Sequence, residues 1–136
     1  MSATDERPAP AVRVRGLRHV ALRVRDVPAA TRFYADVFGM RVVWAPDPDN
    51  VYLSSGTDNL ALHADPGLTP GGGTLDHLGF LVATPEDVHA AASALRARRV
   101  PLAREPAVHR DGSVSCYCRD PDGNLVQILY VPGTAE

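Results

Sequence analysis

One strand-like segment occurs twice in the chain and constrains the fold more than any other feature. Residues 17–24 read LRHVALRV and residues 75–82 read LDHLGFLV, with a His two positions after a Leu in each copy. Apolar side chains follow at every second position, which is the period of a strand buried on one face, so His19 and His77 are expected on the opposite face. A helix-start signal follows each copy at the same distance, which indicates a repeated structural unit.

The first copy opens a unit with the predicted order of one strand, one helix and three strands. Asp26 caps the helix, Pro28 suits its first turn, and Gly39 supplies the left-handed residue that ends it. Turn-forming residues then separate three short apolar runs. The strands predicted from these runs are 40–44, 51–54 and 60–63.

The second copy opens a unit of the same order. Thr84 caps its helix, and Pro85 occupies the first helical position, ahead of acidic residues that suit a helix N-terminus. The strands predicted after this helix are 100–104, 113–119 and 124–131, with a connection over 105–112.

The repeat therefore predicts an α+β fold in which two βαβββ units form one domain. A stretch rich in Gly and Pro between the units cannot continue a strand or a helix, and we expect it to be a linker. The expected organisation is a flexible N-terminal tail over 1–13, a first unit over 14–64, a linker over 65–74, a second unit over 75–131 and a tail over 132–136.

Composition excludes several classes of partner. The net charge of -2 provides no basic surface for nucleic acid or for an anionic membrane, and no apolar run approaches the length of a membrane span. We therefore expect a cytoplasmic protein whose partner is a small molecule. Cys116 and Cys118 share one face of a predicted strand and are interpreted as two buried thiols rather than a disulfide or a metal site.

Four motifs within residues 17–131 match one known family. They are HVALRV at 19–24 followed by Asp26, FYADVFGM at 33–40, the His77 strand, and DPDGN at 120–124. On these motifs the sequence resembles the vicinal oxygen chelate superfamily, which includes glyoxalase I, extradiol dioxygenases, fosfomycin-resistance transferases and bleomycin-binding proteins. The resemblance implies that two βαβββ units curve a mixed sheet into a cup, with the helices on the outer face, and that the protein is a homodimer.

The resemblance also implies a site for a divalent metal ion such as Fe, Zn, Mn or Ni on the inner face of the cup. The family's ligand positions fall on His19, on His77, and on Gln127, four residues after the turn glycine. A fourth position falls on Ala61, which cannot bind metal, and His63, facing the same way, is the candidate to replace it. Because the amide of Gln127 is neutral, it should hold a cation less strongly than a carboxylate does, unless an anionic substrate completes the coordination shell.

Strand periodicity places further candidates on the inner face. Ser115 and Tyr117 alternate with the two cysteines, so both are expected to face the cup. Tyr117 is either a catalytic acid or hydrogen-bond donor, or a ring packed at the edge of the cup. Arg23 either clamps an anionic group of the substrate or lies in solvent at the end of its strand. Tyr52 and Trp44 are expected to line the substrate pocket with their rings.

Two other histidines are expected outside the site. His109 falls in the connection 105–112, where a solvated loop residue is the default interpretation. His89 falls on the polar side of the second helix and is expected at the surface.

Two functional hypotheses remain open. The first is a metal-dependent enzyme that acts on a small oxygenated molecule by a dioxygenase, lyase or isomerase reaction. The second is a metal-free protein that binds a small molecule or an antibiotic, as bleomycin-resistance proteins do, with the same residues as polar contacts in the cup.

Overall fold

Two four-stranded mixed sheets form the framework of the protein, in a computed structural model that describes residues 7–71 and 73–133. Each predicted tail and the linker therefore fall partly outside the described residues. The first unit contains β1 (His19–Val24), α1 (Val27–Phe38), β2 (Arg41–Asp47), β3 (Asn50–Ser54) and β4 (Asn59–Ala64). The second contains β5 (Leu78–Leu81), α2 (Pro85–Ala97), β6 (Leu102–Val108), β7 (Val114–Arg119) and β8 (Leu125–Tyr130).

The two sheets share one topology. The strand order is β1-β4-β3-β2 in the first sheet and β5-β8-β7-β6 in the second. In each sheet the first strand of the unit pairs in parallel with the last, and the other neighbours are antiparallel. The predicted α+β fold with two βαβββ units is confirmed, and β1 and β5 are each left at the edge of their sheet.

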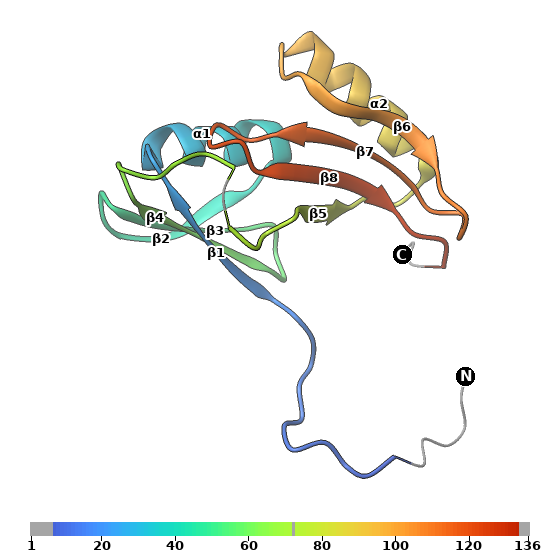
Figure 1. Cartoon of the computed structure of the whole chain (residues 1–136), viewed down its shortest axis with the longest axis horizontal. Helices are drawn as coiled ribbons and strands as arrows, with labels where there is room; N and C mark the ends of the chain where they lie inside the picture. The colour runs from blue at the N-terminus through green and yellow to red at the C-terminus, as the bar shows by residue number, and fades with distance from the viewer. Residues whose placement is uncertain (1–6, 72, 134–136) are drawn as a thin grey trace.

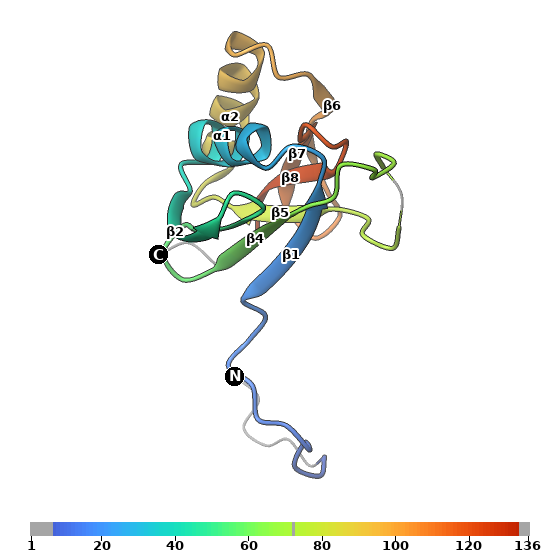
Figure 2. The same cartoon turned by 90° about the vertical axis from the view of Figure 1, so that its left-hand side faces the viewer.

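Each helix covers one face of its own sheet and leaves the other face open. Helix α1 packs on β2, β3 and β4, and α2 packs on β6, β7 and β8, so both helices lie on one side of the molecule (Figure 1). Figure 2 shows that the segment before β1 runs away from both sheets. The open faces are where polar side chains of the sheets can meet a ligand.

The predicted capping residues start both helices. The side chain of Asp26 accepts a hydrogen bond from the backbone N–H of Ala29 at 3.0 Å, and Gly39 ends α1 with a φ of 71°. Thr84 begins α2 with a capping box in which its side chain and that of Asp87 each bond the other's backbone N–H.

The predicted position of β6 is wrong. The strand covers Leu102–Val108 instead of 100–104, so half of the expected connection over 105–112 belongs to a strand. Pro106 lies inside it, which is tolerated because β6 pairs only with β7 and has a free edge where a missing N–H costs no hydrogen bond. Register shifts between the two strands accommodate the irregular backbone.

Buried polar contacts join the first unit to the turn between β7 and β8. The hydroxyl of Tyr34 donates to Asp120 Oδ2 at 2.6 Å, and both residues are buried. The backbone N–H and the Nε of Arg25 both donate to Asp122 Oδ1 at 2.9 Å. Burial and the adjacent Asp120 raise the pKa of the Tyr34 hydroxyl, which therefore stays protonated as a donor. These contacts link segments almost 100 residues apart in the chain.

The free energy of unfolding should fall as the pH rises from about 9 to 11. Cys116 and Cys118 are fully buried, and burial, followed by the neighbouring Cys116 and Asp120, raises the pKa of Cys118 from 9.0 to about 11. The unfolded chain therefore releases this proton at a lower pH than the folded protein. The resulting stability is complete below pH 9 and is lost towards pH 11, by about 2 kcal/mol.

Urea unfolding at several pH values measures this dependence. Cys118→Ala serves as the comparison, since it lacks the thiol and should show a shallower loss between the same two pH values. An equal slope in the variant and in the native protein would contradict the assignment.

Candidate functional site

Four of the predicted site residues meet on the open face of the second sheet. Tyr117 of β7 and Gln127 of β8 lie directly opposite each other in the strand register, and Gln127 Nε2 donates to the Tyr117 hydroxyl at 2.8 Å. The ring of His77, just before β5, meets the Tyr117 ring edge-on at a centroid distance of 5.5 Å. Ser115 occupies the same face of β7 but is almost fully buried.

The amide of Gln127 has a defined orientation. Because its nitrogen donates to Tyr117, its Oε1 atom remains available as an acceptor or as a metal ligand. Gly79 lies opposite Gln127 on β5. A methyl group on Gly79 would come within 3.1 Å of Gln127 Oε1, so the missing side chain leaves room for this oxygen.

His109 belongs to the same site, although the sequence pattern did not predict it. Its Nε2 lies 2.8 Å from the hydroxyl oxygen of Ser115. His109 also lines an open cavity of about 670 Å³ together with His77, Tyr117 and Gln127. The hairpin of β6 and β7 places His109 there, because Ala107 pairs with Ser115 and the loop then folds back over it. Extending the predicted strand to Val108, where β6 ends, would have placed His109 beside the site.

The first sheet carries the remaining predicted residues. Trp44, Tyr52 and His63 form a row across β2, β3 and β4, with ring centroids 4.9 Å apart for Trp44 and Tyr52 and 5.8 Å apart for Tyr52 and His63. Trp44 is 59% exposed, so one side of this row is open to solvent. Arg23 of β1 has a largely exposed side chain 3.7 Å from the carboxylate of Asp65.

Three histidines have their Nδ1 atom in contact with a side-chain oxygen of a neighbouring residue. The Nδ1 atom lies 2.7 Å from Asn59 Oδ1 in His19, 2.6 Å from Asn50 Oδ1 in His63, and 2.7 Å from Asp76 Oδ1 in His77. Each partner oxygen accepts a hydrogen bond, so Nδ1 is the donor, and the neutral imidazole has its lone pair on Nε2. This is the arrangement of a metal-binding imidazole, in which a second group orients the ring.

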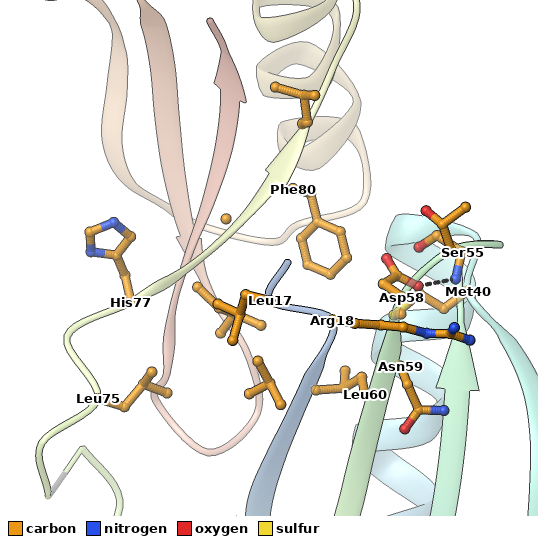
Figure 3. Close-up of a pocket in the computed structure, with 15 residues that line it drawn as sticks. Leu17, Arg18, Met40, Ser55, Asp58, Asn59, Leu60, Leu75, His77 and Phe80 are labelled. Atoms are coloured by element: carbon orange, nitrogen blue, oxygen red, sulfur yellow. Dashed lines mark hydrogen bonds between the residues drawn. The ribbon is translucent and has the colours of Figure 1, made fainter. Parts of the chain in front are cut away.

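The two sheets do not bring their histidines together. A groove of about 650 Å³ separates β1 and β4 from β5, and Figure 3 shows Asn59, the partner of His19, on the opposite side of it from His77. Among the described residues no three His, Cys, Asp or Glu side chains lie close enough to hold a metal ion. Ala61 is fully buried and offers no donor. Within one chain His19 therefore lies apart from His77 and Gln127. We call His19 the first candidate half-site, and His77 with Gln127 the second candidate half-site.

The groove between the sheets exposes apolar side chains. Leu17 is 94% exposed, Leu75 is 42% exposed and Leu81 is 58% exposed, and all three line the groove. Arg18, Asp58 and Asn59 lie on one side of it (Figure 3). An apolar surface with a polar rim next to two sheet edges is typical of a protein–protein contact.

The model of the Glyoxalase/Bleomycin resistance protein/Dioxygenase superfamily matches residues 16–128. The chain belongs to this superfamily. The resemblance inferred from the sequence motifs is thereby confirmed, and the two sheets match the fold of the superfamily's solved structures. No helix in the described residues is long and apolar enough to span a membrane.

Two curated members of the superfamily illustrate its range. Biphenyl-2,3-diol 1,2-dioxygenase 3 of Rhodococcus globerulus is 33% identical over 119 residues, which cover 82% of this chain and 61% of the relative. A putative lactoylglutathione lyase of Brassica oleracea var. gemmifera is 29% identical over 127 residues, which cover 87% of this chain and 45% of the relative. The chain therefore spans less than two thirds of the length of these superfamily members.

Solved structures in the superfamily match over nearly their whole length. A lactoylglutathione lyase from Agrobacterium tumefaciens superposes with a TM-score of 0.73 at 26% identity, covering 86% of this chain and 94% of that one. A glyoxalase/dioxygenase from Nostoc punctiforme superposes with a TM-score of 0.76 at 21% identity, covering 96% and 99%. The second likeness shows the fold alone.

Proposed function

We propose that the protein is a metal-dependent enzyme that acts on a small oxygenated molecule by a dioxygenase, lyase or isomerase reaction. The observation that carries this proposal is the cluster of His77, Tyr117 and Gln127 in one open cavity. It combines an imidazole with an available Nε2, an amide oxygen and a phenol. Superfamily relatives named as a dioxygenase and as a lyase support the reaction types.

The donor atoms suit a divalent ion, but one chain supplies too few of them in one place. His77 Nε2 and Gln127 Oε1 are available in the second half-site, and His19 Nε2 is available in the first. His63, whose Nδ1 is held by Asn50, is the further candidate ligand. A bound Fe, Zn, Mn or Ni ion would polarise the oxygen atoms of the substrate as a Lewis acid.

A homodimer would complete this site. We propose that the first half-site of one copy joins the second half-site of another copy, with the apolar groove as part of the contact. The exposed Leu17, Leu75 and Leu81 and the free edges of β1 and β5 support this arrangement, because a second copy would remove them from water. The site would then include the row of Trp44 and Tyr52 from the first sheet, and Arg23 beside it.

Residues of the second sheet have separate roles in this proposal. The Tyr117 hydroxyl accepts a hydrogen bond from Gln127, so its own proton is free to be donated to a substrate oxygen. His109 is close enough to the cavity to exchange a proton with the ligand, and the buried Ser115 holds its ring in place. The two cysteines, buried as free thiols, agree with the proposed cytoplasmic location.

Metal-free binding of a small molecule or an antibiotic is the second candidate function. The neutral Gln127 and the buried Ala61 favour it, because both stand where the family's metal ligands are expected. In that case the same cavity holds a ligand through Tyr117, Gln127 and His109 alone.

Metal content separates the two functions. Protein purified without chelator and titrated with Zn, Mn, Ni or Fe(II) is expected to bind one ion per chain, and His77→Ala should lose this binding. His89→Ala, at an exposed helix position, is the control and should bind as the native protein does. Absence of binding, together with an unchanged thermal midpoint on adding each ion, would favour the metal-free function.

Replacing Gln127 with Glu should tighten metal binding by about tenfold or more, because a carboxylate adds a negative charge beside the cation. Isothermal titration of Zn or Mn into the variant and the native protein measures the change. The result also tests the residue itself: if the affinity does not change, Gln127 is not a ligand. Binding of the same ion to Tyr117→Phe shows how far the orientation of the Gln127 amide contributes.

A further inference from the structure

Two arginines flank Tyr117 on the open face of the second sheet. Arg104 of β6 lies opposite Tyr117 in the strand register, and its guanidinium carbon is 5.0 Å from the centre of the Tyr117 ring. Arg119 follows Tyr117 by two residues on β7 and so shares its face. Its Nη1 donates to the backbone oxygen of Gly123 at 3.0 Å, which holds the side chain near the turn.

Neither arginine forms an ion pair with a carboxylate of the described residues. The two residues are diagonal neighbours on paired strands, whose residue positions are about 7–8 Å apart, so both positive side chains belong to one part of the face. Stacking on the Tyr117 ring stabilises the cationic side chain of Arg104 there. The acidic side chain nearby is Asp76, which is 89% exposed and hydrogen-bonded to His77.

The same two arginines line one small hollow. Its volume is about 210 Å³, and Asp76 and Asn124 also line it. The Asn124 side chain already donates to Asp120 Oδ2 at 2.9 Å, so the two guanidinium groups carry most of the side-chain N–H donors in the lining. Two of its lining residues contact the larger cavity: Asp76 is hydrogen-bonded to His77 and Arg104 stacks on Tyr117, and both His77 and Tyr117 line that cavity.

We infer that Arg104 and Arg119 form a subsite for an oxyanion, a carboxylate or a phosphate group, carried by the small molecule that this protein binds. A guanidinium presents its N–H groups as a planar fork that matches both kinds of oxyanion, and two such groups on one face can hold an anion from two sides. As a statement about the substrate, this inference rests on the proposed function. The anion site itself does not require the metal.

The geometry orients the ligand. An oxyanion held by Arg104 and Arg119 places the rest of the molecule along the Tyr117 ring towards His77 and Gln127. A negatively charged ligand also suits a site whose protein ligands to a metal are all neutral, because the ligand would supply the charge that Gln127 lacks. The substrate class is therefore a small oxygenated acid or phosphate ester.

Titration of the protein with sodium acetate and with sodium phosphate at constant ionic strength tests the subsite. Backbone and arginine Nε–H signals in NMR spectra report the binding. Saturable shifts at Arg104 and Arg119 are expected, and Arg104→Gln or Arg119→Gln should each weaken the binding by about tenfold or more. Arg32→Gln, at an exposed position on α1, is the matched control and should leave the affinity unchanged.

The outcomes separate the possible ligands and the two proposals. Saturation by phosphate alone supports a phosphate ester, and saturation by acetate alone supports a carboxylic acid. Equal affinities in all three variants, or shifts that do not saturate, would overturn the subsite. Zn or Mn titration of the same variants is expected to match the native protein, so loss of anion binding with intact metal binding assigns the defect to the subsite and not to the metal site.

Discussion

Replacing Asp120 with alanine should lower the free energy of unfolding by about 3–5 kcal/mol. This buried carboxylate accepts four hydrogen bonds, from the Tyr34 hydroxyl, the backbone N–H groups of Asp122 and Asn124, and the Asn124 side chain. Alanine leaves these donors without their acceptor inside the protein, and an unsatisfied buried donor costs about 1–3 kcal/mol. The effect is large because the turn at Asp120 also joins the two units.

Urea unfolding followed by circular dichroism measures this change. Tyr34→Phe removes a single donor and should cost less, about 1–2 kcal/mol. Asp36→Ala, at an exposed position on α1, is the control and is expected to stay within about 0.5 kcal/mol of the native protein. A loss below about 1 kcal/mol for Asp120→Ala would show that the contact does not hold the units together.

Local signals in the sequence were enough to predict the fold. The alternating pattern around His19 and His77 marked two equivalent strands, and the capping residues Asp26 and Thr84 placed the helix starts. Each of these signals acts within a few residues, so it is visible without tertiary structure. Strand alternation placed Tyr117 on the inner face, where the family resemblance also placed Gln127, and the two residues lie opposite each other in the strand register.

The features that were missed depend on how β6 pairs with β7. Glu105 and Pro106 look like a break, and only the pairing of an edge strand with β7 shows that β6 continues through them. His109 enters the site because the hairpin folds it onto Ser115. The pairing of β6 with β7 has to be known before this contact can be predicted.

The separation of His19 from His77 could not be predicted either. Equivalent positions in a repeat imply equivalent places on two sheets, but not how the sheets lie relative to each other. That arrangement follows from contacts such as Tyr34 with Asp120, which join distant parts of the chain. Under the proposed function, the metal centre is therefore shared between two copies of the chain.

A mixture of two defective variants should therefore recover metal binding that neither has alone. In the proposed dimer each site takes His19 from one copy and His77 from the other. When a His19→Ala chain pairs with a His77→Ala chain, one of the two sites therefore keeps both histidines and the other site loses both. Random pairing yields roughly half mixed dimers, so co-expressed chains should bind about a quarter of the native amount of metal.

Elemental analysis of the co-expressed and copurified chains is the most direct measurement of this account. His89→Ala paired with the native chain is the control and should carry the full amount of metal. The account predicts almost no metal in either single variant and about a quarter of the native content in the mixture. No recovery in the mixture would contradict a site shared between copies, and native metal content in both single variants would contradict the metal site itself.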